Sequence, residues 1–80
     1  MPFDMYGDVI LTNDVPHHGL RAGDVGTIVE RHVVPGPNEE GYSAEFFDMT
    51  GNAVGVATLP ASALRQPTPA DRPAVRALSA

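Results

Sequence analysis

Residues 19–30 read Gly19-Leu20-Arg21-Ala22-Gly23-Asp24-Val25-Gly26-Thr27-Ile28-Val29-Glu30. Glycine reaches positive φ at no steric cost, and Gly and Asp are frequent turn residues, so residues 23–26 predict a tight turn. The β-branched residues after it (Thr27, Ile28 and Val29) predict a strand that the turn feeds directly. The segment holds no nucleophile beside a base, no phosphate-binding glycine loop and no set of metal ligands. It therefore indicates a fold and leaves the function open.

Length and composition favour one small domain. A chain of 80 residues buries only about 60% of the surface it exposes when unfolded, so its core is small. The sequence has no cysteine, which excludes disulfides and thiolate zinc sites. No apolar run approaches the roughly 20 residues that a membrane helix needs, and the first residues lack the features of a signal peptide. We expect a bacterial-type cytoplasmic location and no membrane contact.

The charge balance is acidic. Ten Asp and Glu residues face five Lys and Arg, giving a net charge of −5, and all five cations are arginines. An acidic domain repels nucleic-acid phosphates, whose neutralisation supplies most non-specific affinity. We therefore expect the chain to avoid nucleic acid. A basic protein partner suits this charge, and solubility alone is the other explanation.

Short β-rich segments separated by turn residues predict an all-β domain. The expected strands are residues 5–12, 26–34, 42–48, 53–59 and 64–66. One short helical turn is expected at residues 60–64, before the last strand. Residues 13–19 and 33–41 are rich in Pro, Gly and Asn and are expected as loops. Residues 48–52 predict a hairpin turn, with Gly51 in the left-handed position.

Alternation in the third strand separates its side chains onto two faces. The expected core face carries Tyr42, Ala44 and Phe46, and the opposite face carries Ser43, Glu45 and Phe47. Because Glu45 marks the second face as the wetter one, Phe47 is the aromatic residue that we expect to be exposed.

The composition changes at Pro67. Pro67, Pro69 and Pro73 favour a flexible or polyproline-like segment. We expect a domain over residues 1–66 and a Pro-rich flexible tail over residues 67–80. Residues 74–78 could form one helical turn against a partner, although isolated helices this short are marginal in water.

Four segments carry a family resemblance: residues 7–11, 19–30, 42–48 and 59–65. In this order they resemble the DUF4926 family of small bacterial proteins, over residues 4–66. The resemblance implies a small five-stranded SH3-like barrel of uncharacterised function, with a partner-binding, antitoxin-like or accessory-subunit role. It implies no catalytic residue. The turn at residues 23–27 also resembles the KOW element of nucleic-acid-binding barrels.

Two loop histidines and several acids are candidates for chemistry. His17 and His18 follow Asp14, but a zinc site needs three or four converging ligands, and we expect neighbouring loop side chains to diverge. A solvated loop tip is favoured over a metal site or a pH switch. Asp24 and Asp48 are expected to bond backbone amides at their turns. We expect no metal and no cofactor.

Hydroxyl nucleophiles are present by residue type only. None of them lies in a Gly-x-Ser-x-Gly pattern, and the sequence places no base beside them. The residues considered are Ser43, Ser62, Thr27 and Thr58. We therefore expect no catalytic residue and no enzyme activity.

The favoured hypothesis is a protein-interaction module, with an acidic and partly aromatic face. Its candidate partner-binding residues are Tyr6, His17, His18, Arg21, Glu45 and Phe47. The alternative is a KOW-type nucleic-acid-binding barrel that uses Arg21 and Arg31, and a small enzyme or accessory subunit is the third class. We expect a monomer or a weak homodimer, paired through the first strand or the closing strand as an open edge.

Overall fold

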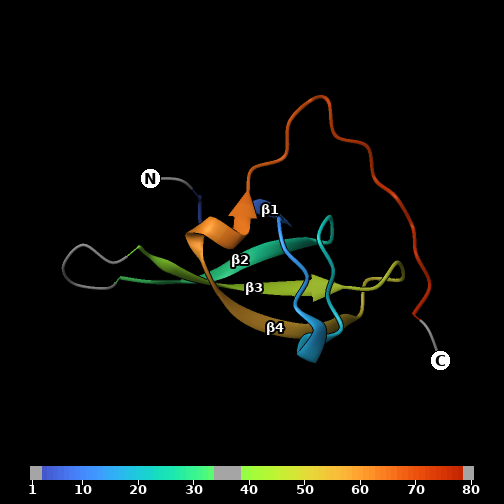
Figure 1. The fold of residues 1–80 in the computed structure, drawn as a ribbon, viewed down its shortest axis with the longest axis horizontal. Coiled ribbons are helices and arrows are strands. Elements are labelled where there is room, and N and C mark those ends of the chain that lie inside the picture. Colours follow the sequence, from blue (N-terminus) through green and yellow to red (C-terminus); the bar gives the residue numbers. More distant parts are fainter. Residues whose placement is uncertain (1–2, 34–38, 79–80) are drawn as a thin grey trace.

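A computed structural model describes residues 3–33 and 39–78 of the chain (Figure 1). The fold is all-β, as predicted, with two short 3₁₀ turns (η1 and η2). Its elements are β1 (Asp8–Leu11), η1 (Pro16–His18), β2 (Val25–His32), β3 (Gly41–Phe47), β4 (Ala53–Pro60), η2 (Ala61–Ala63) and β5 (Leu64–Arg65). All pairings are antiparallel, and the strand order is β4-β3-β2-β1-β5.

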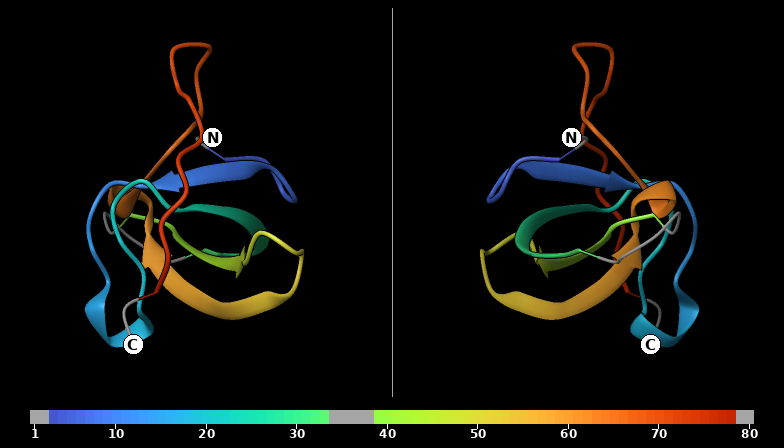
Figure 2. Two further views of the ribbon diagram at one scale, coloured as in Figure 1. Left: turned by 90° about the vertical axis from the view of Figure 1, so that its right-hand side faces the viewer. Right: turned by 90° about the vertical axis from the view of Figure 1, so that its left-hand side faces the viewer.

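The edges of the sheet are β4 and β5, so the strand pairing among the described residues does not close into a ring. Of the two strands expected as an open edge, the closing strand β5 does lie at an edge, whereas β1 lies between β2 and β5. The sheet is strongly bent, and Figure 2 shows β4 curving beneath β2 and β3 while β1 lies on their other side. Register shifts at Val29 of β2 and at Val54 of β4 accompany the bend, since bulges increase local twist.

The concave side of the sheet encloses the core. Tyr42 and Ala44 are fully buried and Phe46 is nearly so, which confirms the predicted core face of β3. Phe3 packs edge-on against Tyr42, with ring centroids 5.1 Å apart, a geometry that aromatic pairs favour. The buried cluster comprises Phe3, Val9, Leu11, Val15, Leu20, Ile28, Tyr42, Ala44, Phe46, Ala57, Leu59, Ala63 and Leu64.

The turn before β2 lies two residues earlier than predicted. The amide of Asp24 donates to the carbonyl of Arg21 at 3.0 Å, and Gly23 has a φ of +96°, so the turn spans residues 21–24. As predicted, the Asp24 carboxylate accepts a backbone hydrogen bond, from the amide of Arg21 at 2.9 Å. Gly26 lies inside β2 and not in the turn.

The first strand is shorter than predicted because its start is a turn. Tyr6 has a positive φ of 63°, and the amide of Gly7 donates to the carbonyl of Asp4 at 3.0 Å. β1 therefore begins at Asp8. Other boundaries differ by one or two residues, and Val34 lies outside the described residues.

The β3–β4 hairpin follows the prediction. Oδ1 of Asp48 accepts the amides of Thr50 and Asn52 at 2.9 and 3.0 Å, and Gly51 has a φ of +90°. Hydrogen bonds from Thr50 and Asn52 hold the pKa of the Asp48 carboxyl below its usual value. The loop after β1 contains η1, which the sequence did not indicate.

After β5 the chain forms an extended tail, residues 67–78, with no regular secondary structure. The tail rises from β5, arches away from the sheet and returns along the side where η1 and the turn before β2 lie (Figure 1). Its flexibility in solution stays a prediction. No helix among the described residues is long and apolar enough to cross a membrane.

Candidate functional site

The β3–β4 hairpin presents an apolar surface at the edge of the sheet. Its members are Phe47, Met49, Val54 and Val56, which are 45, 81, 57 and 50% exposed. Phe47 ends β3, Met49 lies in the hairpin, and both valines lie on β4. We call these four residues the β4 surface.

The β4 surface coincides with a free strand edge. β4 pairs only with β3 among the described strands, so its other side offers backbone donors and acceptors. Edge strands are commonly protected by lysine, proline or inward-pointing charge. In β4 only the last residue is a proline, and the strand carries no charged residue. An eight-residue edge of this composition is a candidate for pairing with another chain.

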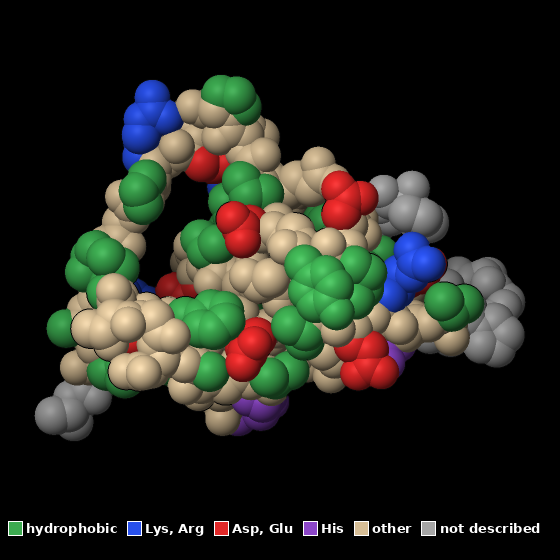
Figure 3. Space-filling view, turned by 180° about the vertical axis from the view of Figure 1, so that it is seen from behind, with side chains coloured by type: hydrophobic (Ala, Val, Ile, Leu, Met, Phe, Trp, Pro, Cys, Tyr) green, Lys and Arg blue, Asp and Glu red, His purple; other side chains and the backbone are tan. Residues whose placement is uncertain are grey.

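Acidic side chains flank this surface. Glu45 lies between Thr27 and Val56 in the strand register, on the convex face of the sheet. Asp48 begins the adjoining turn. Figure 3 shows hydrophobic and acidic side chains side by side over the body of the molecule. Such a mixture suits a segment that is both apolar and basic.

The predicted partner-binding residues are distributed over three parts of the sheet. Glu45 and Phe47 share β3 and adjoin the β4 surface. Tyr6, which is 73% exposed, lies on the β1 side of β2, where its amide donates to the carbonyl of Ile28 at 2.8 Å. Phe47 is exposed, as predicted, and Tyr6 is more exposed still.

The remaining predicted residues lie in the β1–β2 connection. His17 and His18 belong to η1, and Arg21 begins the turn before β2. The two imidazole rings lie together with centroids 4.5 Å apart, so the expectation that they diverge is wrong. No group of three His, Asp or Glu side chains placed to hold a metal occurs in residues 3–33 and 39–78.

A polar cluster on the convex face was missed at the sequence level. Nε2 of His32 and Oγ of Ser43 share a hydrogen bond of 2.8 Å, and Oγ of Ser43 shares another of 2.8 Å with Oγ1 of Thr58. Ser43 is only 6% exposed. The three side chains come from β2, β3 and β4, so the cluster cross-links neighbouring strands. Only the strand register reveals it, because 11 and 15 residues separate the partners in sequence.

This cluster places a hydroxyl beside an imidazole, as a catalytic triad does, but the nearby carboxylate of Glu30 lies at the wrong nitrogen of the imidazole ring. Oε1 of Glu30 lies 3.9 Å from Nε2 of His32, the same nitrogen that meets Ser43. In a serine triad the acid binds the other ring nitrogen and thereby fixes the tautomer. The geometry therefore fits a structural link between strands. The expectation that the chain is not an enzyme stays a prediction.

These features define a small all-β domain, built on one bent antiparallel sheet with an apolar edge. The chain belongs to the DUF4926 family, described as a domain of unknown function, whose model matches residues 5–66. This confirms the resemblance carried by the sequence and leaves the tail outside the matched region. Comparisons with curated proteins and with solved structures each gave no match.

Proposed function

We propose that this protein is an interaction module whose β4 surface binds an extended segment of a partner protein. The observation that carries the proposal is the edge of β4, which no other described strand pairs with, and beside which Val54 and Val56 are exposed. A partner strand would gain main-chain hydrogen bonds from the edge and apolar contacts from the two valines.

Charge defines the kind of partner. The chain has a net charge of −5, and two of its five arginines are engaged in ion pairs with Asp24 and Asp71. Glu45, beside Val56 in the register, would face a Lys or Arg on the partner. We therefore infer a segment in which apolar side chains alternate with basic ones.

We also infer that the bent sheet is an SH3-like barrel, the fold that the family resemblance implies. The order β4-β3-β2-β1-β5 and the 3₁₀ turn η2 between β4 and β5 agree with this inference. Peptide binding is a common use of such small barrels. The KOW-type alternative receives less support, because the turn before β2 contains the Asp24 carboxylate and donates a backbone hydrogen bond to the carboxylate of Asp14.

The test compares two arginine variants of the full chain. Val54→Arg combined with Val56→Arg places like charge against a basic partner and removes apolar contact. Val33→Arg is the matched control, since Val33 is also exposed (73%) and lies outside the β4 surface. Proteins cross-linked to the wild-type chain in its source cells are identified, purified and titrated against all three forms.

The double variant is expected to bind at least about tenfold more weakly, a loss typical of central interface residues. The control is expected to bind as the wild type does. Equal affinity of both variants would refute the β4 surface as the docking site. Retention of RNA by the wild type in a low-salt filter assay, lost with Arg21→Ala and Arg31→Ala, would favour the nucleic-acid alternative instead.

A further inference from the structure

The tail returns to the domain through one arginine. Nη2 of Arg76 donates to Oδ2 of Asp24 at 2.6 Å, and Nε donates to Oδ1 at 3.2 Å. Both carboxylate oxygens of Asp24 therefore bind the same guanidinium, an arrangement that adds strength and directionality. Nη2 also donates to the carbonyl of Gly19 at 3.3 Å.

The acceptor groups are held in place by bonds within the β1–β2 connection. Oδ2 of Asp24 accepts the amide of Arg21 at 2.9 Å, and Oδ1 of Asp14 accepts the amide of Ala22 at 2.9 Å. The Asp24 hydrogen bond and the charges of Asp24 and Asp14 raise the pKa of the Arg76 guanidinium. A fixed carboxylate, a second carboxylate nearby and a carbonyl form a set of acceptors suited to a planar guanidinium.

The site is a property of the domain and not of the tail. Its acceptors lie between residues 14 and 24, inside the region that matches the family, whereas Arg76 lies outside it. A surface hollow lies beside these acceptors. The turn and Asp14 form its wall on the domain, and Ala74 and Arg76 form its wall on the tail. The tail supplies the guanidinium that binds these acceptors, so an arginine of another chain can bind there in its place.

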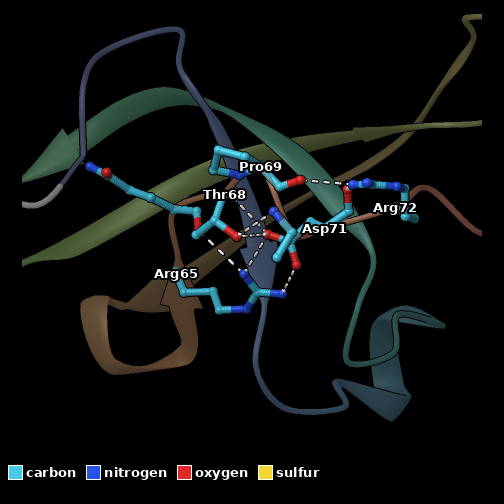
Figure 4. A network of polar contacts seen from close by, with 7 residues as sticks. Arg65, Thr68, Pro69, Asp71 and Arg72 are labelled. Carbon is cyan, nitrogen blue, oxygen red and sulfur yellow. Dashed lines mark hydrogen bonds and ion pairs between the residues drawn. The ribbon is translucent and has the colours of Figure 1, made fainter.

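Between its two anchors the tail stands off the domain, and Figure 3 shows an opening between them. The first anchor is the ion pair between Arg65 and Asp71, with nitrogen–oxygen distances of 2.7 and 2.9 Å (Figure 4). The second anchor is Arg76. Release of Arg76 therefore frees the end of the tail while the first anchor stays in place.

We propose that the β1–β2 connection holds an arginine-binding site, whose ligand in a complex is an arginine of the partner segment. Arg76 fills this site in the free chain and competes with that ligand. The identity of the ligand as a partner arginine rests on the proposed function, whereas the affinity of the site for a guanidinium does not. When an internal group occupies a site, the apparent affinity for a ligand equals the intrinsic affinity multiplied by the fraction of molecules in which the site is free.

The experiment uses the full chain with Arg76→Ala and the peptide acetyl-Ala-Val-Arg-Ala-Leu-amide, which carries residues 74–78. Binding is followed through the amide NMR signals of Gly19, Ala22 and Gly23. We expect saturable shifts in the variant with a dissociation constant in the millimolar range or weaker, because exposed ion pairs contribute little to the free energy of binding. Wild-type protein should bind the peptide at least several-fold more weakly.

Two controls separate recognition from charge attraction. A peptide with lysine in place of arginine should bind more weakly, because it cannot span both carboxylate oxygens. Adding Asp24→Asn to Arg76→Ala should abolish the shifts while leaving the turn, since an amide oxygen can still accept the Arg21 amide. Absence of shifts in the Arg76→Ala variant, or equal binding of both peptides, would overturn the proposal.

The outcome is independent of the β4 surface. Val54→Arg and Val56→Arg, added to Arg76→Ala, should leave the peptide shifts unchanged. Peptide binding with no partner bound at β4 would uphold the arginine site and refute the proposed function. A partner bound at β4 with no peptide binding would refute the arginine site and leave the proposed function in place.

Discussion

The ring of Phe46 lies directly against the backbone of Gly26. A Cβ built on Gly26 would lie 2.8 Å from Cε2 and 2.9 Å from Cζ of that ring. The two residues are cross-strand partners of β2 and β3, and their contact faces the core. Gly26 is therefore required by the volume of its neighbour and not by a left-handed backbone conformation.

Gly26→Ala should lower the free energy of unfolding by about 2 kcal/mol, because overpacking forces the ring or the strand to move. Gly55→Ala is the matched control. Gly55 is the partner of Phe46 on the other side, but a Cβ there meets nothing within 4 Å, so its effect should stay within about 0.5 kcal/mol. Urea unfolding of both variants gives the comparison. If both variants lost the same unfolding free energy, the contact with Phe46 would not explain why residue 26 is a glycine.

The hydroxyl of Tyr42 provides a pH-dependent contribution to stability. It donates to Oε1 of Glu40 at 2.7 Å, and burial, followed by this hydrogen bond, raises the pKa of Tyr42 above its usual 10.0. The folded state thus favours the neutral phenol. Its contribution is fully present below the unfolded pKa and is lost as the pH rises through the folded pKa.

Tyr42→Phe should cost about 1 kcal/mol at neutral pH, the usual net value of one hydrogen bond. It should also flatten the fall in unfolding free energy above about pH 10, the tyrosine reference value. Chemical denaturation at several alkaline pH values measures both effects. Tyr6→Phe is the control, since Tyr6 is largely exposed, and a similar flattening there would contradict the assignment to Tyr42.

Asp71 should titrate far below an ordinary carboxyl. The Arg65 guanidinium, followed by the amide of Thr68, holds the pKa of Asp71 well below its usual value of 3.8. The contribution of Asp71 is present above the unfolded pKa and is lost as the pH falls through the folded one. Carboxyl ¹³C NMR should show Arg65→Gln moving the titration of Asp71 upward. Arg72→Ala should leave it in place, since among residues 3–33 and 39–78 the Arg72 guanidinium donates to the backbone carbonyls of Pro69 and Asp71 and not to the Asp71 carboxylate.

The local pattern of the sequence predicted most of the sheet. β-branched runs and glycine-containing turns located four of the strands to within a residue or two, and alternation placed Tyr42, Ala44 and Phe46 in the core. The turn before β2 was misplaced because Gly26 was interpreted as a turn glycine. A glycine is required at position 26 because the ring of Phe46, 20 residues later in the chain, lies against it, and only the strand register shows that contact.

The candidate sites were harder to predict because they depend on pairing between distant segments. His32, Ser43 and Thr58 meet across three strands, and Arg76 meets Asp24 across 52 residues. Nothing in the local sequence states which polar residues will become neighbours. Alternation within one strand was enough to predict that Glu45 and Phe47 lie on the face opposite the core.

Removing the tail should leave a folded sheet. The buried cluster extends only from Phe3 to Leu64, so a chain ending after Gln66 loses the Arg65–Asp71 and Arg76–Asp24 ion pairs and little apolar burial. Exposed ion pairs contribute little to stability, so the midpoint of thermal unfolding should fall by only a few degrees, on the order expected for a small domain. Circular dichroism of the shortened chain measures this, and loss of a cooperative transition would show that the tail is part of the fold.

Ser43→Ala tests the polar cluster as a link between strands. It removes the partner that His32 and Thr58 share, but both of these side chains are open to solvent, so the cost should be about 1 kcal/mol, the usual net value of a hydrogen bond. Ser62→Ala is the control, because Ser62 is exposed and its hydroxyl donates to Oε2 of Glu39 at 3.1 Å, and its effect should be within about 0.5 kcal/mol. Combining Ser43→Ala with Thr58→Val should cost less than the sum of the single changes, since removing both hydroxyls leaves fewer unpaired groups. Strict additivity in urea unfolding would mean that the two hydroxyls contribute to stability independently.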